Sequence, residues 1–144
     1  MRFDVQNQLS VAQAFVASAV SSNSYKKQSA AQDLSIGRRM ALLVLPVVAA
    51  GAGSSHQLQV IQATDAALTA GVDVLAEVVK LAAELVPGEA IEVPIPQGVM
   101  SKQYIGFKDI ITGGVTTVTL DVYLVPQDEI AMYKSFPKVV DADV

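Results

Sequence analysis

Several residue types that build chemical sites are absent or rare in this chain of 144 residues. It has no cysteine, so it forms neither disulfides nor thiolate metal sites. Its one histidine, His56, excludes a metal site made of several histidines. Tryptophan is absent and there are four tyrosines, which is little for a glycan-binding face built on exposed aromatic rings. We therefore expect no metal and no cofactor.

The chain also lacks an excess of positive charge and a long hydrophobic run. Its formal net charge is −4, which argues against a general nucleic-acid-binding protein. The longest apolar run, Met40 to Ala50, is about half of the roughly 20 residues that a membrane-spanning helix needs, and it contains Pro46. The N-terminus shows no hydrophobic region of a signal peptide. We expect a protein made in the cytoplasm, with no nucleic-acid partner and no membrane partner.

What the chain has in excess is apolar residues. They make up 51% of it, charged residues make up 17%, and the mean hydropathy is +0.41. For a small domain this composition favours an apolar surface that is committed to an interface. The alternative is a core that is simply rich in alanine and valine.

Short runs of valine, isoleucine, leucine and threonine, separated by turn residues, predict an all-β fold. Between residues 56 and 64, Leu58 and Val60 alternate with glutamines, as in a strand with two different faces. Residues 40–48 are apolar on both faces, as in a buried strand. Gly113-Gly114 predicts a hairpin turn before the strand at 118–124. The pattern is typical of an antiparallel β-sandwich or a jelly roll.

The segment at residues 73–88 allows two interpretations. Its local pattern favours a helix, because Leu75, Val78 and Val79 share one helical face with Ala82 and Val86. The β-rich sequence on both sides favours a strand over Val74 to Val79. We expect the strand, because tertiary context overrides local propensity.

The stretch "IEVPIPQG", residues 91–98, has the period of a strand but carries Pro94 and Pro96 on one side. Proline cannot donate a hydrogen bond to a sheet, so this strand cannot be central. We expect an edge strand whose prolines prevent uncontrolled pairing with other strands.

Catalytic motifs are missing from the sequence. It contains no GxSxG, no GxGxxG and no P-loop. His56 follows Gly-Ser-Ser at the start of a strand, and we expect it to be an exposed residue at the end of a loop. Asp65 follows Thr64 and is expected to bond the backbone of its own turn. We therefore expect a protein that is not an enzyme.

Three stretches together resemble a known family. They are "FDVQNQLSVAQAFVASAVSSNSY", "LLVLPVVAAGAGSSHQLQVIQATDAAL" and "IEVPIPQGVMSKQYIGFKDIITGGVTTVTLDVYLV". In this order they resemble the capsid cement, or decoration, proteins of tailed bacteriophages, in the group typified by the cement protein of a Bordetella podophage. The matching residues in the first stretch are Asp4, Ser10, Ala12, Gln13, Ala14, Ser22 and Asn23.

The resemblance implies a jelly-roll domain on the outer surface of an icosahedral head, where it ties major capsid proteins together. Its partners would be the major capsid protein and a second copy of the chain, with a homodimer favoured and a trimer left open. Residues 1–126 would form the capsid-binding domain, and residues 127–144 a C-terminal arm or flexible tail. The alternatives are another virion component, such as a head-completion or tail protein, and a glycan-binding jelly-roll module.

Four groups of residues are expected to contact the shell or another copy. They are the polar loop residues Tyr25, Lys26 and Lys27, the small residues Gly51, Ala52 and Gly53, the prolines Pro94 and Pro96, and the tail residues Ile130, Met132, Tyr133 and Phe136.

Overall fold

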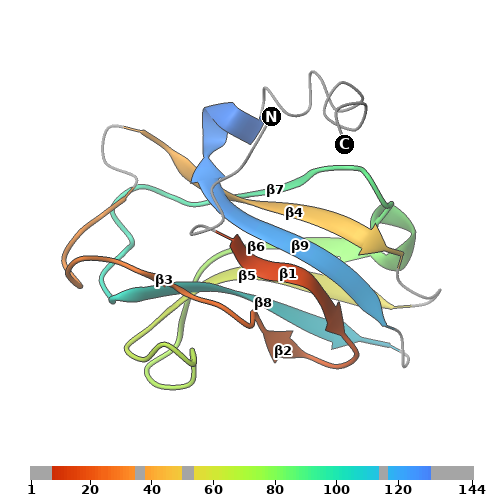
Figure 1. Ribbon diagram of the computed structural model, residues 1–144, viewed down its shortest axis with the longest axis horizontal. Coiled ribbons are helices and arrows are strands. Elements are labelled where there is room, and N and C mark those ends of the chain that lie inside the picture. The colour runs from red at the N-terminus through yellow and green to blue at the C-terminus, as the bar shows by residue number, and fades with distance from the viewer. Residues whose placement is uncertain (1–7, 35–37, 50–53, 114–116, 131–144) are drawn as a thin grey trace.

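The structure is a computed structural model that describes residues 8–34, 38–49, 54–113 and 117–130. These residues form a two-layer sandwich of antiparallel strands (Figure 1). The strands are β1 (Gln8–Phe15), β2 (Ala19–Val20), β3 (Tyr25–Lys26), β4 (Met40–Val48), β5 (Ser55–Ala63), β6 (Asp73–Leu81), β7 (Ile91–Pro94), β8 (Tyr104–Thr112) and β9 (Val118–Pro126). No helix in the ranges given is long and apolar enough to cross a membrane.

The first sheet has the strand order β1-β9-β4-β7, and the second has the order β2-β8-β5-β6, with β3 also paired to β8. Every pairing is antiparallel. The prediction of an all-β antiparallel sandwich is therefore confirmed. The finer prediction of jelly-roll topology stays a prediction.

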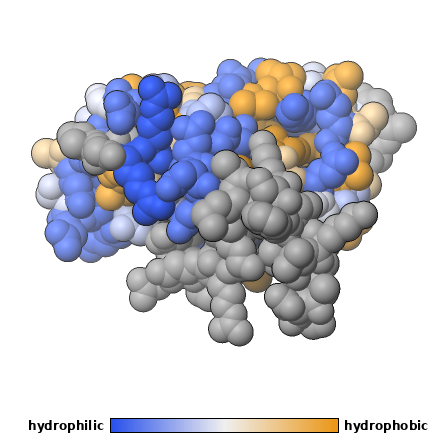
Figure 2. Space-filling view, turned by 90° about the horizontal axis from the view of Figure 1, so that it is seen from above, coloured by the Kyte–Doolittle hydropathy of each residue, from blue (hydrophilic) through white to orange (hydrophobic). Residues whose placement is uncertain are grey.

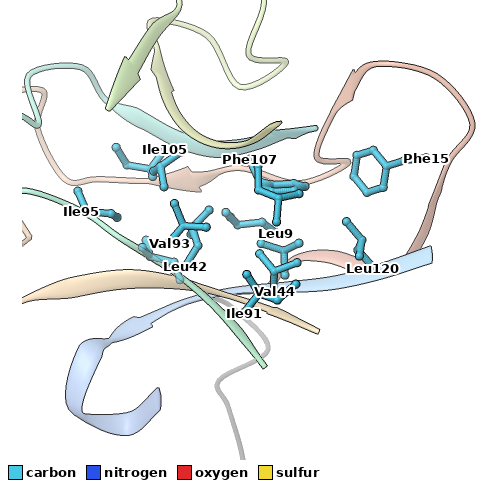
Figure 3. Close-up of a cluster of buried hydrophobic side chains, with 14 of the residues drawn as sticks. Leu9, Phe15, Leu42, Val44, Ile91, Val93, Ile95, Ile105, Phe107 and Leu120 are labelled. Atoms are coloured by element: carbon cyan, nitrogen blue, oxygen red, sulfur yellow. The ribbon is translucent and has the colours of Figure 1, made fainter. Parts of the chain in front are cut away.

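The core lies between the two sheets, and both contribute alternate residues to it. Figure 3 shows side chains of the first sheet, among them Leu42 and Leu120, pointing toward Ile105 and Phe107 of the second. Phe15 meets Phe107 edge to face, with ring centroids 5.6 Å apart. The predicted alternation in β9 is confirmed by the buried residues Val118, Leu120, Val122 and Leu124.

The prediction of a hairpin at Gly113-Gly114 is wrong. β8 lies in the second sheet and β9 lies in the first, so the chain crosses from one layer to the other between them. Gly113 has a φ of 79°, a conformation that glycine adopts without a steric penalty. The turn signal in the sequence was real, but local sequence does not say which strand pairs with which.

The segment that allowed a helix is the strand β6, as expected from its context, and it is longer than predicted. Eight of its nine residues are in register with β5, with Leu75 left out at a register shift, and Leu75 and Val78 pack against the core. A single 3-10 turn, Ala82–Glu84, follows it. Pairing with this segment satisfies the backbone donors and acceptors along the outer side of β5. A helix at this edge of the sheet would leave those groups of β5 unpaired.

The domain extends beyond residue 126, because Ile130 belongs to it. A helical turn at residues 127–130 places Ile130 on the outer face of the first sheet, where it is 0% exposed. There it packs with Ala41, Leu43 and Val125. The prediction that Ile130 contacts a neighbour is therefore wrong, since its side chain is used within the chain. This contact also explains why β4 is apolar on both faces.

We expect Ile130→Ala to destabilise the domain by about 2–5 kcal/mol, because it removes a buried branched side chain and leaves a cavity over β4. The free energy of unfolding in urea measures the loss, with Glu129→Ala as the neighbouring control. A loss of stability no larger than that of the control would show that the turn at 127–130 does not contribute to the stability of the domain.

Candidate functional site

Four exposed valines gather at one end of the sandwich, which we call the apolar end: Val16, Val47, Val48 and Val86. Their exposed fractions run from 41% to 62%. Val48 is in register with Thr119 of β9, and Thr119 is also in register with Ala14 of β1. The Gly88 N–H donates to the Pro46 carbonyl at 3.3 Å, which brings the loop containing Val86 to the same end.

Figure 2 shows the same division from above. Hydrophilic residues dominate the end where β4 begins, and hydrophobic residues gather toward the end where β4 stops. A cluster of exposed β-branched side chains costs free energy in water, which burial against another surface would recover. The apolar end is thus the candidate docking surface of the described part of the chain.

The loop that joins β4 to β5 starts at this end. Three predicted contact residues, Gly51, Ala52 and Gly53, belong to it and lie outside the described residues. The last described residue before them is Ala49, which is exposed, and the first after them is Ser54, which is buried. The contact of this segment with a partner therefore stays a prediction.

Beneath the apolar end lies a chain of three buried polar side chains. His56 Nδ1 is 2.9 Å from Asp109 Oδ2, and His56 Nε2 is 2.8 Å from Ser54 Oγ. His56 and Asp109 are 0% exposed and Ser54 is 3% exposed. Among the described residues, Asp109 Oδ1 has no hydrogen-bond partner. The group therefore joins the start of β5 to the middle of β8 inside the sandwich.

The prediction that His56 is an exposed loop-end residue is wrong. In a strand, residues two apart share a face, and His56 is two residues from Leu58 and four from Val60. Both are fully buried core residues. That period was visible in the sequence and would have placed His56 inside, but a single histidine after Gly-Ser-Ser carries no signal for its distant partner Asp109.

The connectivity of the three residues is that of a hydrolytic Ser-His-Asp triad, but their burial gives them another use. A serine nucleophile must reach a substrate carbonyl, and Ser54 is enclosed by the domain. Ser54 also accepts a backbone hydrogen bond at its carbonyl from Ala82 N, at 3.0 Å. The arrangement is a polar clamp that holds β5, β8 and the 3-10 turn together below the apolar end.

Burial in the clamp raises the pKa of the Asp109 carboxyl, since a charged form is poorly solvated there, although the hydrogen bond from His56 acts in the opposite direction. The folded protein thus holds a proton on Asp109 more readily than the unfolded chain does. Stability from this proton is fully present below the ordinary aspartate pKa of about 3.9 and is lost as pH rises through the folded pKa.

The predicted prolines lie at the opposite end of the sandwich. β7 is an edge strand next to β4, as expected, with Ile91, Val93 and Ile95 buried and the prolines exposed. The prolines also line a shallow hollow of about 380 Å³, whose lining residues are Arg39, Pro94, Ile95, Pro96, Gln97 and Gln127. Beside it, Arg38 forms an ion pair with Asp128 at 3.0 Å.

The predicted basic loop is only partly a surface. Lys26 is exposed in β3, and Tyr25 is half-buried against the core. Lys27 is 1% exposed, and its Nζ donates to the carbonyls of Ala30, at 3.0 Å, and Gln32, at 2.6 Å. Burial lowers the pKa of Lys27. The prediction that Lys27 contacts a partner is therefore wrong, and Lys26 alone presents its charge outward.

The predicted contact residues are thus not brought together. Lys26 and the prolines lie toward the end where β4 begins, whereas the last described residues before 50–53 are at the apolar end. Met132, Tyr133 and Phe136 lie outside the described residues. Within the described ranges, no group of three or more histidine, aspartate or glutamate side chains could hold a metal ion. Asp65 has the predicted turn role, accepting from the N–H groups of Thr69 and Ala70.

We expect Asp109→Asn to change the pH dependence of stability. The asparagine mimics the protonated carboxyl, so the variant lacks the loss of stability that Asp109 causes as pH rises above about 4. The free energy of unfolding of the variant relative to the wild type should therefore improve from pH 4 to pH 7. A relative stability that falls over this range would show that an ion pair with His56 outweighs burial.

Comparison with known proteins does not place this arrangement in a family. No protein-family model matches the chain, and no curated protein matches its sequence. The surfaces described above, together with the resemblance in the sequence, are the basis for assigning a function.

Proposed function

We propose that this chain is a capsid cement protein of a tailed bacteriophage, which binds the outer surface of the icosahedral head and ties major capsid proteins together. The sequence resemblance supports the family. The observation that carries the proposal in the structure is the apolar end, with its four exposed valines around the start of the small-residue loop at 50–53. The role is structural and not catalytic.

The physical work of a cement protein is linkage. A protein that binds the assembled shell, and not its separate subunits, stabilises the assembly by RT ln(1 + c/Kd) per site, where c is the concentration of free protein and Kd its dissociation constant for the shell. A surface of exposed valines suits this work, because association buries apolar area without leaving a buried charge unpaired. Small residues in the adjoining loop let a partner backbone approach closely.

The polar clamp supports the same role. Docking through the apolar end transmits load from the shell to β4 and β5, which lie in different sheets. The buried hydrogen bonds of His56 tie β5 to β8 just below that end. A surface that moves little on binding loses less conformational entropy, which leaves more of the interaction energy as affinity.

The test is co-sedimentation of the purified protein with heads of its own phage that lack it, in the unexpanded and the expanded form. We expect saturable binding at many copies per head and a higher melting temperature of the shell. Val47→Lys combined with Val48→Lys should weaken binding roughly tenfold or more, because two anchors of the docking surface become charged.

The matched control is Val11→Lys, since Val11 is an equally exposed valine on β1, away from the apolar end. Equal binding by the double variant and the control would refute the role of the apolar end. Binding of only a few copies per head would identify a head-completion or tail component instead. No binding to either form of the head would refute the cement function.

A further inference from the structure

A sandwich of two open sheets has four edges, and three of them are protected against pairing with other chains. The β7 edge is short and carries Pro94. The β1 edge is irregular, because its register with β9 shifts twice and Ala12 has a φ of 41°. The remaining short edge is made of β2 and β3, which have two residues each. Prolines, irregular backbone and short strands are the usual means of blocking strand addition.

The fourth edge, β6, has almost no such protection. It runs for nine residues from Asp73 to Leu81 and contains neither proline nor glycine. Its register with β5 shifts once, between Val60 and Ile61 of β5, and is regular from Ala76 to the end of the strand. Within the described residues, β5 is its only strand partner. Along the other side, alternate residues therefore present backbone donors and acceptors to solvent, except that the Leu81 N–H donates to Glu84 Oε1 at 3.0 Å.

The outward-facing side chains of β6 are mostly apolar. Val74, Val79 and Leu81 are 52% to 58% exposed, and they are in register with Ile61, Gln57 and Ser55 on the outer face of the sheet. Glu77 is the only charged residue in that outward row. A long, regular edge with β-branched side chains and little charge is a template for pairing with another strand.

We propose that β6 pairs antiparallel with β6 of a second copy of this chain. A two-fold axis perpendicular to the sheet generates this pairing, and it keeps outward-facing residues of both copies on the same outer face. Each copy then offers the other the same apolar row and the same free backbone groups. The two five-stranded sheets become one continuous sheet across the axis.

Charge restricts the register of this pairing. An axis at Glu77 would place two carboxylates directly opposite each other, and an axis at Lys80 would place two ammonium groups opposite each other. Like charges in directly opposed positions destabilise a strand pair. An axis at Val78 or Val79 avoids both and pairs valine with valine at its centre. The self-complementary row favours a second copy over an unrelated strand.

The expected strength is moderate. Pairing through one strand buries less than the roughly 800 Å² per partner of a standard interface, so the dimer should dissociate reversibly on dilution. This dimer would form in the free protein, whether or not the chain binds a capsid.

Sedimentation equilibrium of the wild type from low to high micromolar concentration tests the proposal. We expect a concentration-dependent dimer, and we expect Val79→Glu to weaken it about tenfold or more, because the new carboxylate would lie opposite another carboxylate in either register. With the axis at Val78 it would face Glu77 of the other copy, and with the axis at Val79 it would face the same substituted position. Val11→Glu, at an exposed valine on β1, should dimerise like the wild type. A wild type that stays monomeric throughout, or equal dimerisation by the two variants, overturns the proposal.

Amide hydrogen exchange of the wild type gives a second test that needs no variant. Protection of the alternate amides at 76–80 that do not bond β5 should rise with the fraction of dimer. A dimer without that protection overturns the proposal by placing the interface elsewhere, and protection that appears only with phage heads assigns β6 to a shell strand instead. The double variant at Val47 and Val48 should dimerise normally, so loss of dimerisation and loss of head binding are separate results.

Discussion

Unpaired backbone at the sheet edges is the constraint around which this molecule is built. Two sheets that pack face to face without closing into a barrel leave N–H and C=O groups free along their outermost strands. Three edges are protected in different ways. Pro94 ends β7, an irregular backbone interrupts β1, and β2 and β3 are too short to pair stably with another strand. The exposed prolines that stand out in the sequence belong to this set. β6 has one register shift near its start and no other such device, which makes it the part of the described sandwich most open to association.

The second constraint is the support of the apolar end. If the strands beneath this surface moved, its exposed valines would contact other apolar surfaces without specificity. The buried hydrogen bonds from Ser54 through His56 to Asp109 hold two strands in fixed positions directly under that surface. Asp109 has an oxygen without a hydrogen-bond partner among the described residues, and its pKa is raised by burial. A buried polar group that is costly to desolvate favours one arrangement of its partners, since any other arrangement leaves more of its atoms unsatisfied.

The sequence predicts the features that depend on period and on proline, and misses those that depend on contacts between distant segments. The alternation in β5 and β9, the edge position of β7 and the turn at Asp65 are local, and all are present. The pairing of His56 with Asp109 spans 53 residues, and no local signal encodes it. Lys27 and Ile130 resemble surface residues in their segments, yet both are buried: Lys27 donates to two carbonyls of its own loop, and Ile130 packs on the outer face of the first sheet. β6 is intermediate, because its helical period is overruled by pairing with β5.

The two proposed association surfaces, the apolar end and the β6 edge, lie on different parts of one domain. Paired β6 strands run antiparallel, so a two-fold axis perpendicular to the sheet points the apolar ends of the two copies in opposite directions along the strands. Two apolar ends that face apart do not engage one flat surface together, so the dimer adds no avidity for such a surface. Strand pairing through β6 and docking through the apolar end are therefore separate contacts, and each must be strong enough by itself. The protected edges limit strand addition to pairs of copies, because a second free edge on each copy would allow an open chain of copies to form.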